Sequence, residues 1–143
     1  MAVLTDIIIA PAADVPAIIH EWPGKKRWSA FETSGLDWLV LADLASALLQ
    51  PGIARSIEEQ DPSAEADSSD GPWLYVLPTE FRDRIADIGA TELDAVAAAW
   101  SGGEEASNRG LDTEPAKRLL LEIRRMAVQA RSEQKPILLW VSM

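Results

Sequence analysis

Three segments of the chain carry the apolar pattern of β-strands. Residues 3–9 are rich in β-branched side chains, residues 72–77 alternate between two apolar faces, and residues 136–141 form a last apolar run. Short runs of this kind, bounded by proline or glycine, are typical of strands. We therefore expect a small sheet of about three strands, in which the first and last strands lie near each other.

Apolar residues three and four positions apart predict about five helices packed on this sheet. The second helix is apolar almost all round, as buried central helices are, and Ser34 and Asp37 have the spacing of a capping box at its start. The order β-α-α-β-α-α-α-β indicates a single α+β domain over residues 1–143. The helical segments are residues 14–22, 34–50, 79–88, 91–100 and 112–131.

Two segments lack a pattern of regular structure. Residues 25–32 form a basic, aromatic connector between the first two helices. Residues 58–71 are acidic, rich in serine and almost free of large apolar side chains, so burial cannot offset the entropy lost on ordering them. We expect a mobile acidic loop at residues 58–71, which brief proteolysis cuts first.

Composition and charge exclude several classes of function. The net charge of −10 repels phosphate backbones, which disfavours nucleic-acid binding and permits a basic protein partner. No apolar run reaches the roughly 20 residues that a membrane span needs, and the first ten residues lack the basic start of a signal peptide. We expect an acidic cytoplasmic protein without membrane contact, and the pattern leaves its oligomeric state open.

Motifs of catalysis and of metal or cofactor binding are missing from the sequence. There is no cysteine, and the single histidine, His20, has no serine elbow or second histidine near it. The chain has neither a P-loop nor a dinucleotide-binding glycine turn. The acidic loop fails the EF-hand pattern, because placing Gly71 at the sixth position puts Ala66 at the first. We predict no catalytic residue, no metal site and no cofactor.

Two groups of residues remain as candidates for binding a ligand or partner. Trp28 follows Lys25, Lys26 and Arg27 without a periodic reason for burial, and a tryptophan among cations suits an anionic or aromatic group. The alternative for Trp28 is a plain hydrophobic anchor of its loop.

The second group follows Trp100, which is succeeded by a serine and two glycines. The glycines would let a ligand approach the backbone closely, and Glu104 and Glu105 could act as acid and base. The alternative is a helix stop followed by an exposed loop. The candidate binding residues are Lys25, Arg27, Trp28, Trp100, Glu104 and Glu105.

Three stretches of the chain resemble the YfbM-like bacterial proteins. They are the helix LDWLVLADLASALL at residues 36–49, the strand GPWLYVLP at 71–78 and the closing strand KPILLWVS at 135–142. The resemblance implies an α+β domain of bacterial origin and brings no catalytic residues with it. The start of the chain departs from the family pattern.

Two classes of function fit these observations. The first is a non-catalytic binding or regulatory module that binds a basic protein partner, as immunity proteins and inhibitors do. The second is an enzyme for a small substrate, which would use a carboxylate as acid and base in a pocket lined by aromatic side chains. We favour the first, because nucleophilic, metal-dependent and phosphate-binding chemistry all lack their motifs.

Overall fold

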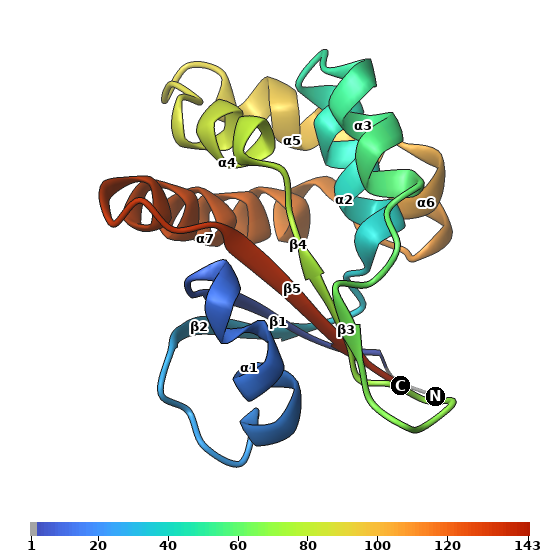
Figure 1. Ribbon diagram of the computed structural model, residues 1–143. Coiled ribbons are helices and arrows are strands. Elements are labelled where there is room, and N and C mark those ends of the chain that lie inside the picture. The colour runs from blue at the N-terminus through green and yellow to red at the C-terminus, as the bar shows by residue number, and fades with distance from the viewer. Residues whose placement is uncertain (1–2) are drawn as a thin grey trace.

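In a computed structural model, residues 3–143 are described, and they form a five-stranded antiparallel sheet in the order β2-β1-β5-β4-β3 (Figure 1). The first and last strands pair at its centre, in a register that runs from Leu4 opposite Ser142 to Ile9 opposite Ile137. The prediction that these two strands lie together is confirmed. The strands are β1 (Leu4–Ile9), β2 (Ser29–Ser34), β3 (Ala64–Glu65), β4 (Trp73–Val76) and β5 (Ile137–Ser142).

The helices lie on both faces of this sheet, most of them on one (Figure 1). A short 3₁₀ turn (Ala12–Asp14) leads into α1 (Val15–Glu21). The opposite face is covered by α2 to α7, of which α7 is the longest. They are α2 (Trp38–Ala47), α3 (Pro51–Glu58), α4 (Thr79–Ala86), α5 (Leu93–Ser101), α6 (Glu104–Asn108) and α7 (Thr113–Ser132).

The alternation of side chains along the central strands divides the core in two. Ile7 and Leu139 point toward α2–α7 and belong to the larger cluster of buried residues. Ile8 and Leu138 point to the other face, where they pack with residues of α1 such as Ile18. A helix of seven residues is only about 10 Å long, so α1 leaves part of this second face open.

The α+β class is confirmed, whereas the predicted counts of about three strands and five helices are too low for residues 3–143, which hold five strands and seven α-helices. The segment expected to be a connector, residues 25–32, overlaps β2 (Ser29–Ser34), an edge strand whose residues are exposed or half-buried. An edge strand with no fully buried face carries little apolar alternation, so its sequence does not look like a strand. The added helices, α3 and α6, are short.

The start of α2 also differs from the prediction. Asp37 is the N-cap, and its Oδ1 accepts hydrogen bonds of 3.0 Å from the backbone N–H groups of Leu39 and Val40. Its Oδ2 pairs with the guanidinium of Arg109. Ser34 belongs to β2 instead, so the predicted capping box is wrong. The side chain of Asp37 alone caps the N-terminus of α2 by accepting hydrogen bonds from its first free N–H groups.

The acidic segment 58–71 is partly regular. Ala64 and Glu65 form β3 against β4, and backbone bonds extend the hairpin from Ser63 N–H to Leu74 O (2.7 Å) and from Ala66 N–H to Pro72 O (3.0 Å). These bonds fix the segment to the sheet edge, a role that its composition does not predict. Its susceptibility to brief proteolysis stays a prediction.

Candidate functional site

The part of the second sheet face that α1 leaves open contains a hollow of about 250 Å³. Its walls come from β1, β2, β5 and the loop that follows α1. We call it the Asp6 pocket. It is lined by Leu4, Asp6, Pro23, Lys26, Glu32, Thr33 and Trp140.

The register of the sheet brings the polar side chains of this pocket together. Asp6 in β1 lies opposite Glu32 in β2 on one side and opposite Trp140 in β5 on the other. Side chains directly opposite each other on antiparallel strands share one face, with Cβ atoms about 4.5–5.5 Å apart. Trp140, Asp6 and Glu32 therefore form a row across three strands.

Asp6 is a carboxylate almost out of contact with water, with 7% of its surface exposed. Its Oδ2 accepts a hydrogen bond of 2.5 Å from Nε1 of Trp22, at the end of α1. Burial raises the pKa of Asp6, and the charge of Glu32 raises it further, while the Trp22 bond and Lys26 act in the other direction. A buried carboxyl next to a second carboxylate is an arrangement found more often at functional sites than in ordinary cores.

Lys26 supplies the positive charge of the pocket. Its Nζ pairs with Oε1 of Glu32 and lies 5.8 Å from the ring centroid of Trp22. The bond to Glu32 raises the pKa of Lys26. About half of each side chain of the pair is exposed, so the contact contributes little to stability and its partners can exchange. Lys26 thus pairs with Glu32, and its charge also lowers the pKa of the neighbouring Asp6.

Asp6→Asn is expected to raise the melting temperature at pH 7. The folded-state pKa of Asp6 is raised, so the folded protein binds more protons than the unfolded chain and loses stability as pH rises through that pKa. An asparagine keeps an oxygen for Trp22 and carries no charge, so its advantage should shrink as pH falls toward 4. Melting curves from pH 4 to 8 measure this. Asp61→Asn, which removes the same charge from an exposed position, is the control and should not show this pH dependence.

The first group of predicted binding residues lies in the loop between α1 and β2, next to the Asp6 pocket. Nε1 of Trp28 donates a hydrogen bond of 3.0 Å to Asp14, and the guanidinium of Arg27 lies 4.6 Å from the Trp28 ring centroid. Arg27 also pairs with Glu21 at 2.6 Å, and Lys25 approaches the same carboxylate at 3.9 Å. These contacts anchor the loop, and a ligand-binding role of the three residues stays a prediction.

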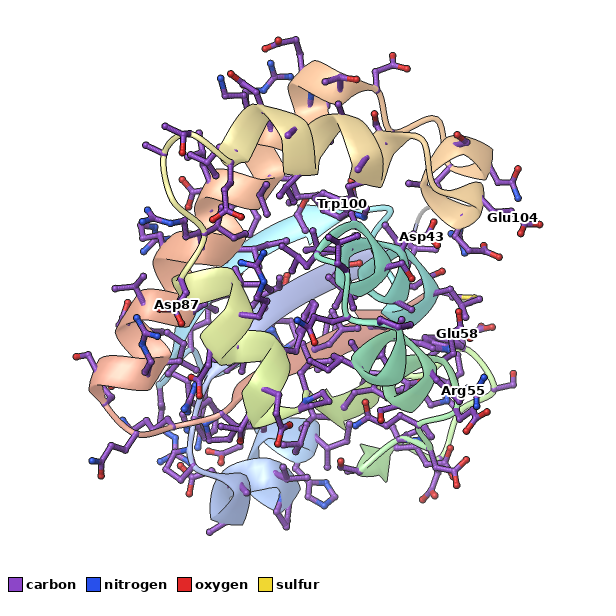
Figure 2. The ribbon with its side chains drawn as sticks, turned by 90° about the horizontal axis from the view of Figure 1, so that it is seen from above. Asp43, Arg55, Glu58, Asp87, Trp100 and Glu104 are labelled. Atoms are coloured by element: carbon purple, nitrogen blue, oxygen red, sulfur yellow. The ribbon has the colours of Figure 1, made fainter. Side chains whose placement is uncertain are left out.

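The second group lies on the other side of the sheet. Trp100 is fully buried, and its Nε1 donates a hydrogen bond of 2.9 Å to the carbonyl of Val40. Glu104 is exposed and Glu105 half-buried in α6, and Figure 2 shows Glu104 directed away from Trp100. The structure therefore does not bring Trp100, Glu104 and Glu105 together in one pocket with Trp28. Their role in binding stays a prediction.

The two glycines after Trp100 serve a close approach within the chain. A Cβ on Gly103 would lie 2.6 Å from Oδ2 of Asp43, and the same oxygen accepts a hydrogen bond of 2.9 Å from the N–H of Ala106. Asp43, labelled in Figure 2 beside α6, thus satisfies an N–H group in the first turn of that helix. The close contact predicted for a ligand is made by a carboxylate of α2.

Sequence reasoning missed Asp6, Glu32 and Trp140 as a group. One signal was available: Asp6 is a lone carboxylate inside a strand that is otherwise apolar. Such a residue must find a polar partner or carry a shifted pKa. Nothing in the sequence pairs it with Glu32, because that pairing depends on a strand that was not predicted.

Within residues 3–143, no set of three or more histidine and acidic side chains is placed to hold a metal ion. The helices of the same part of the chain are all too short or too polar to cross a membrane. Comparison with known proteins gives no matching family model, no matching curated protein and no matching solved structure. The resemblance to the YfbM-like proteins stays a prediction.

Proposed function

We propose that this chain is a non-catalytic binding module that recognises a basic side chain of a protein partner in the Asp6 pocket. The observation that carries the proposal is that Glu32, which lies opposite the buried Asp6 on the neighbouring strand, already pairs with an ammonium group, that of Lys26. The pocket therefore has the chemistry to take a lysine or arginine from outside. A module of this kind would act in the cytoplasm as immunity proteins and inhibitors do.

The shape and charge of the pocket suit a long cationic side chain. Lysine and arginine have an apolar stem, which would lie along Leu4, Pro23 and Trp140, and a charged head, which would reach the carboxylates. With Lys26 displaced, two carboxylates would face one incoming cation. The net charge of −10 would speed the encounter with a basic partner, especially at low salt.

Replacing both carboxylates should weaken the binding of a basic probe. We expect Asp6→Asn together with Glu32→Gln to reduce the affinity for hexalysine by about tenfold or more, measured by calorimetry at low salt. The matched control is Asp61→Asn with Glu65→Gln, which removes the same charge from the opposite sheet edge. Equal losses in both variants would mean that hexalysine senses only the net charge, and the proposal would be wrong.

A small-substrate enzyme is the second candidate, and the raised pKa of Asp6 favours it. A carboxyl whose pKa is raised by burial can act as a general acid beside a second carboxyl group, here that of Glu32. Asp6 and Glu32 lie directly opposite each other on neighbouring strands, and retaining glycosidases use a pair of close carboxyl groups. Turnover of chromogenic glycosides that disappears in Asp6→Asn, while hexalysine fails to bind, would favour this candidate.

A further inference from the structure

The two edge strands of the sheet differ in length and in how well they are protected from pairing with another strand. One edge is β3, which has two residues and is flanked by acidic loops. The other edge is β2, which has six residues and contains neither lysine nor proline, the usual means of blocking an edge. β2 is thus the open edge of the sheet.

The backbone groups that β2 presents to solvent can be assigned from one hydrogen bond. The N–H of Gly35 donates to Val3 O at 2.9 Å, in the same register that places Ser34 opposite Leu4. Hydrogen-bonded and non-hydrogen-bonded pairs alternate along an antiparallel ladder. The N–H and C=O groups of Ala30, Glu32 and Ser34 therefore point away from β1, toward the open edge.

A groove of about 310 Å³ runs beside this edge, between β2 and the first half of α7. The preceding loop and α7 contribute Leu111, Pro115 and Leu119, and β2 contributes Phe31. Arg118 and Glu122 lie among these apolar side chains. A strand placed beside β2 would direct every second side chain into this groove and the alternate ones to the face of the Asp6 pocket.

We infer that the basic partner binds by strand addition: one of its segments pairs antiparallel with β2, sets a basic side chain opposite Glu32 and places apolar side chains in the groove. This inference rests on the proposed function and names its mode of docking. Main-chain bonds would supply affinity and the alternate side chains would supply specificity. Every existing pair in the sheet is antiparallel, and the added strand continues that pattern.

The position opposite Glu32 is where a cation is needed. It continues the row of Trp140, Asp6 and Glu32 by one strand, and its Cβ would lie about 5 Å from that of Glu32. A lysine there could take the place that Lys26 occupies in the free protein. The side-chain pocket and the strand edge thus recognise the same segment.

The same charge argues against a second copy of this chain as the occupant. In the antiparallel register that pairs the outward-facing backbone groups of Ala30, Glu32 and Ser34 with the same groups of a copy, Glu32 would lie opposite Glu32. Like charges directly opposite each other destabilise a strand pair. A segment with lysine or arginine at this position has no such conflict.

The probe for the test is the peptide acetyl-Val-Lys-Val-Lys-Val-amide, which reads the same in both directions. In the antiparallel pairing its two lysine N–H groups face β2, and its valine side chains face the groove. Backbone N-methylation of both lysine residues should weaken binding by about tenfold or more, because each removes a hydrogen bond to the edge. Backbone N-methylation of the central and last valine residues, whose N–H groups face solvent, should leave the affinity unchanged.

A protein variant tests the same edge. Ala30→Pro removes one outward N–H group without breaking the ladder to β1, which an edge strand tolerates. It should weaken peptide binding by about tenfold, and amide chemical shifts of β2 and the first half of α7 should move with the parent peptide alone. If this variant does not fold, the two methylated peptides still test strand addition, because they are measured with the unaltered protein.

The outcomes separate the two proposals. If the carboxylate variants lose binding while Ala30→Pro and lysine N-methylation do not, the basic-site proposal stands and strand addition is wrong. If Ala30→Pro and lysine N-methylation abolish binding but the carboxylate variants do not, strand addition at β2 stands and the basic-site proposal is wrong. A dimer of the protein that Ala30→Pro dissociates, or no binding of the peptide at millimolar concentration, would overturn the choice of a basic strand as occupant.

Discussion

Trp100→Ala is expected to lower the free energy of unfolding by about 4 kcal/mol, the usual cost of truncating a fully buried aromatic side chain. Trp100 has no exposed surface and lies in the core between the sheet and α2–α7. The substitution would leave a cavity and would remove the hydrogen bond from the indole to Val40. Denaturation by urea, followed by circular dichroism, measures the loss.

Two further variants separate packing from hydrogen bonding. Trp100→Phe keeps most of the ring volume and should cost about 1–2 kcal/mol, mainly through the lost indole bond and a smaller cavity. Trp28→Ala truncates a half-buried tryptophan on the other sheet face and should cost less than Trp100→Ala. A stable Trp100→Ala protein that loses a binding activity would support the ligand role predicted from the sequence.

Gly71→Ala is expected to destabilise the protein by about 3 kcal/mol, for two independent reasons. Gly71 has a φ of +86°, a conformation that costs an alanine about 1–2 kcal/mol. An added Cβ would also lie 2.7 Å from Cε3 of Trp73 and 3.1 Å from Val141 O. The Trp73 ring and the central strand β5 must then shift to make room. Chemical denaturation measures the difference.

Gly52→Ala is the matched control for this substitution. Gly52 lies in the first turn of α3, where a Cβ meets nothing within 4 Å. Alanine there restricts the unfolded chain and favours the helix, so the protein should gain about 0.5–1 kcal/mol. Opposite signs for the two glycines would show that local geometry decides the effect. Equal losses at both positions would contradict the backbone described for Gly71.

The central strands could be predicted because the sheet buries them on both faces. Ile7 and Ile8 point to opposite faces and both are fully buried, so β1 is an apolar run, and the same holds for Leu138 and Leu139 of β5. β2 could not be predicted, because no strand of residues 3–143 pairs with its outer side and Phe31 is its one large apolar residue. An edge strand such as β2 forms because it pairs with its neighbour, and the local pattern of apolar residues carries no information on that pairing.

The candidate site residues also show that a local sequence pattern does not reveal contacts between distant segments. Glu104 follows Trp100 closely in sequence, yet α5 turns the indole into the core while α6 exposes the glutamate. Asp6 and Glu32 are far apart in sequence and become neighbours through the register of β1 and β2. The sequence shows that Trp100 and Glu104 are close along the chain, and this closeness is the basis for grouping them. The register of β1 and β2, which brings Asp6 and Glu32 together, cannot be read from the sequence.

The pairing of β1 with β5 has a consequence for how the protein folds. These central strands are far apart in sequence, so the long segment between Ile9 and Ile137 must close into a loop before the middle of the sheet can form. Contacts this distant in sequence slow folding. On the ribosome, the pair of β1 and β2 would wait until β5 has been made, with one side of β1 unpaired. During that interval the unpaired edge of this apolar strand could pair with a strand of another chain, so the nascent protein is exposed to aggregation.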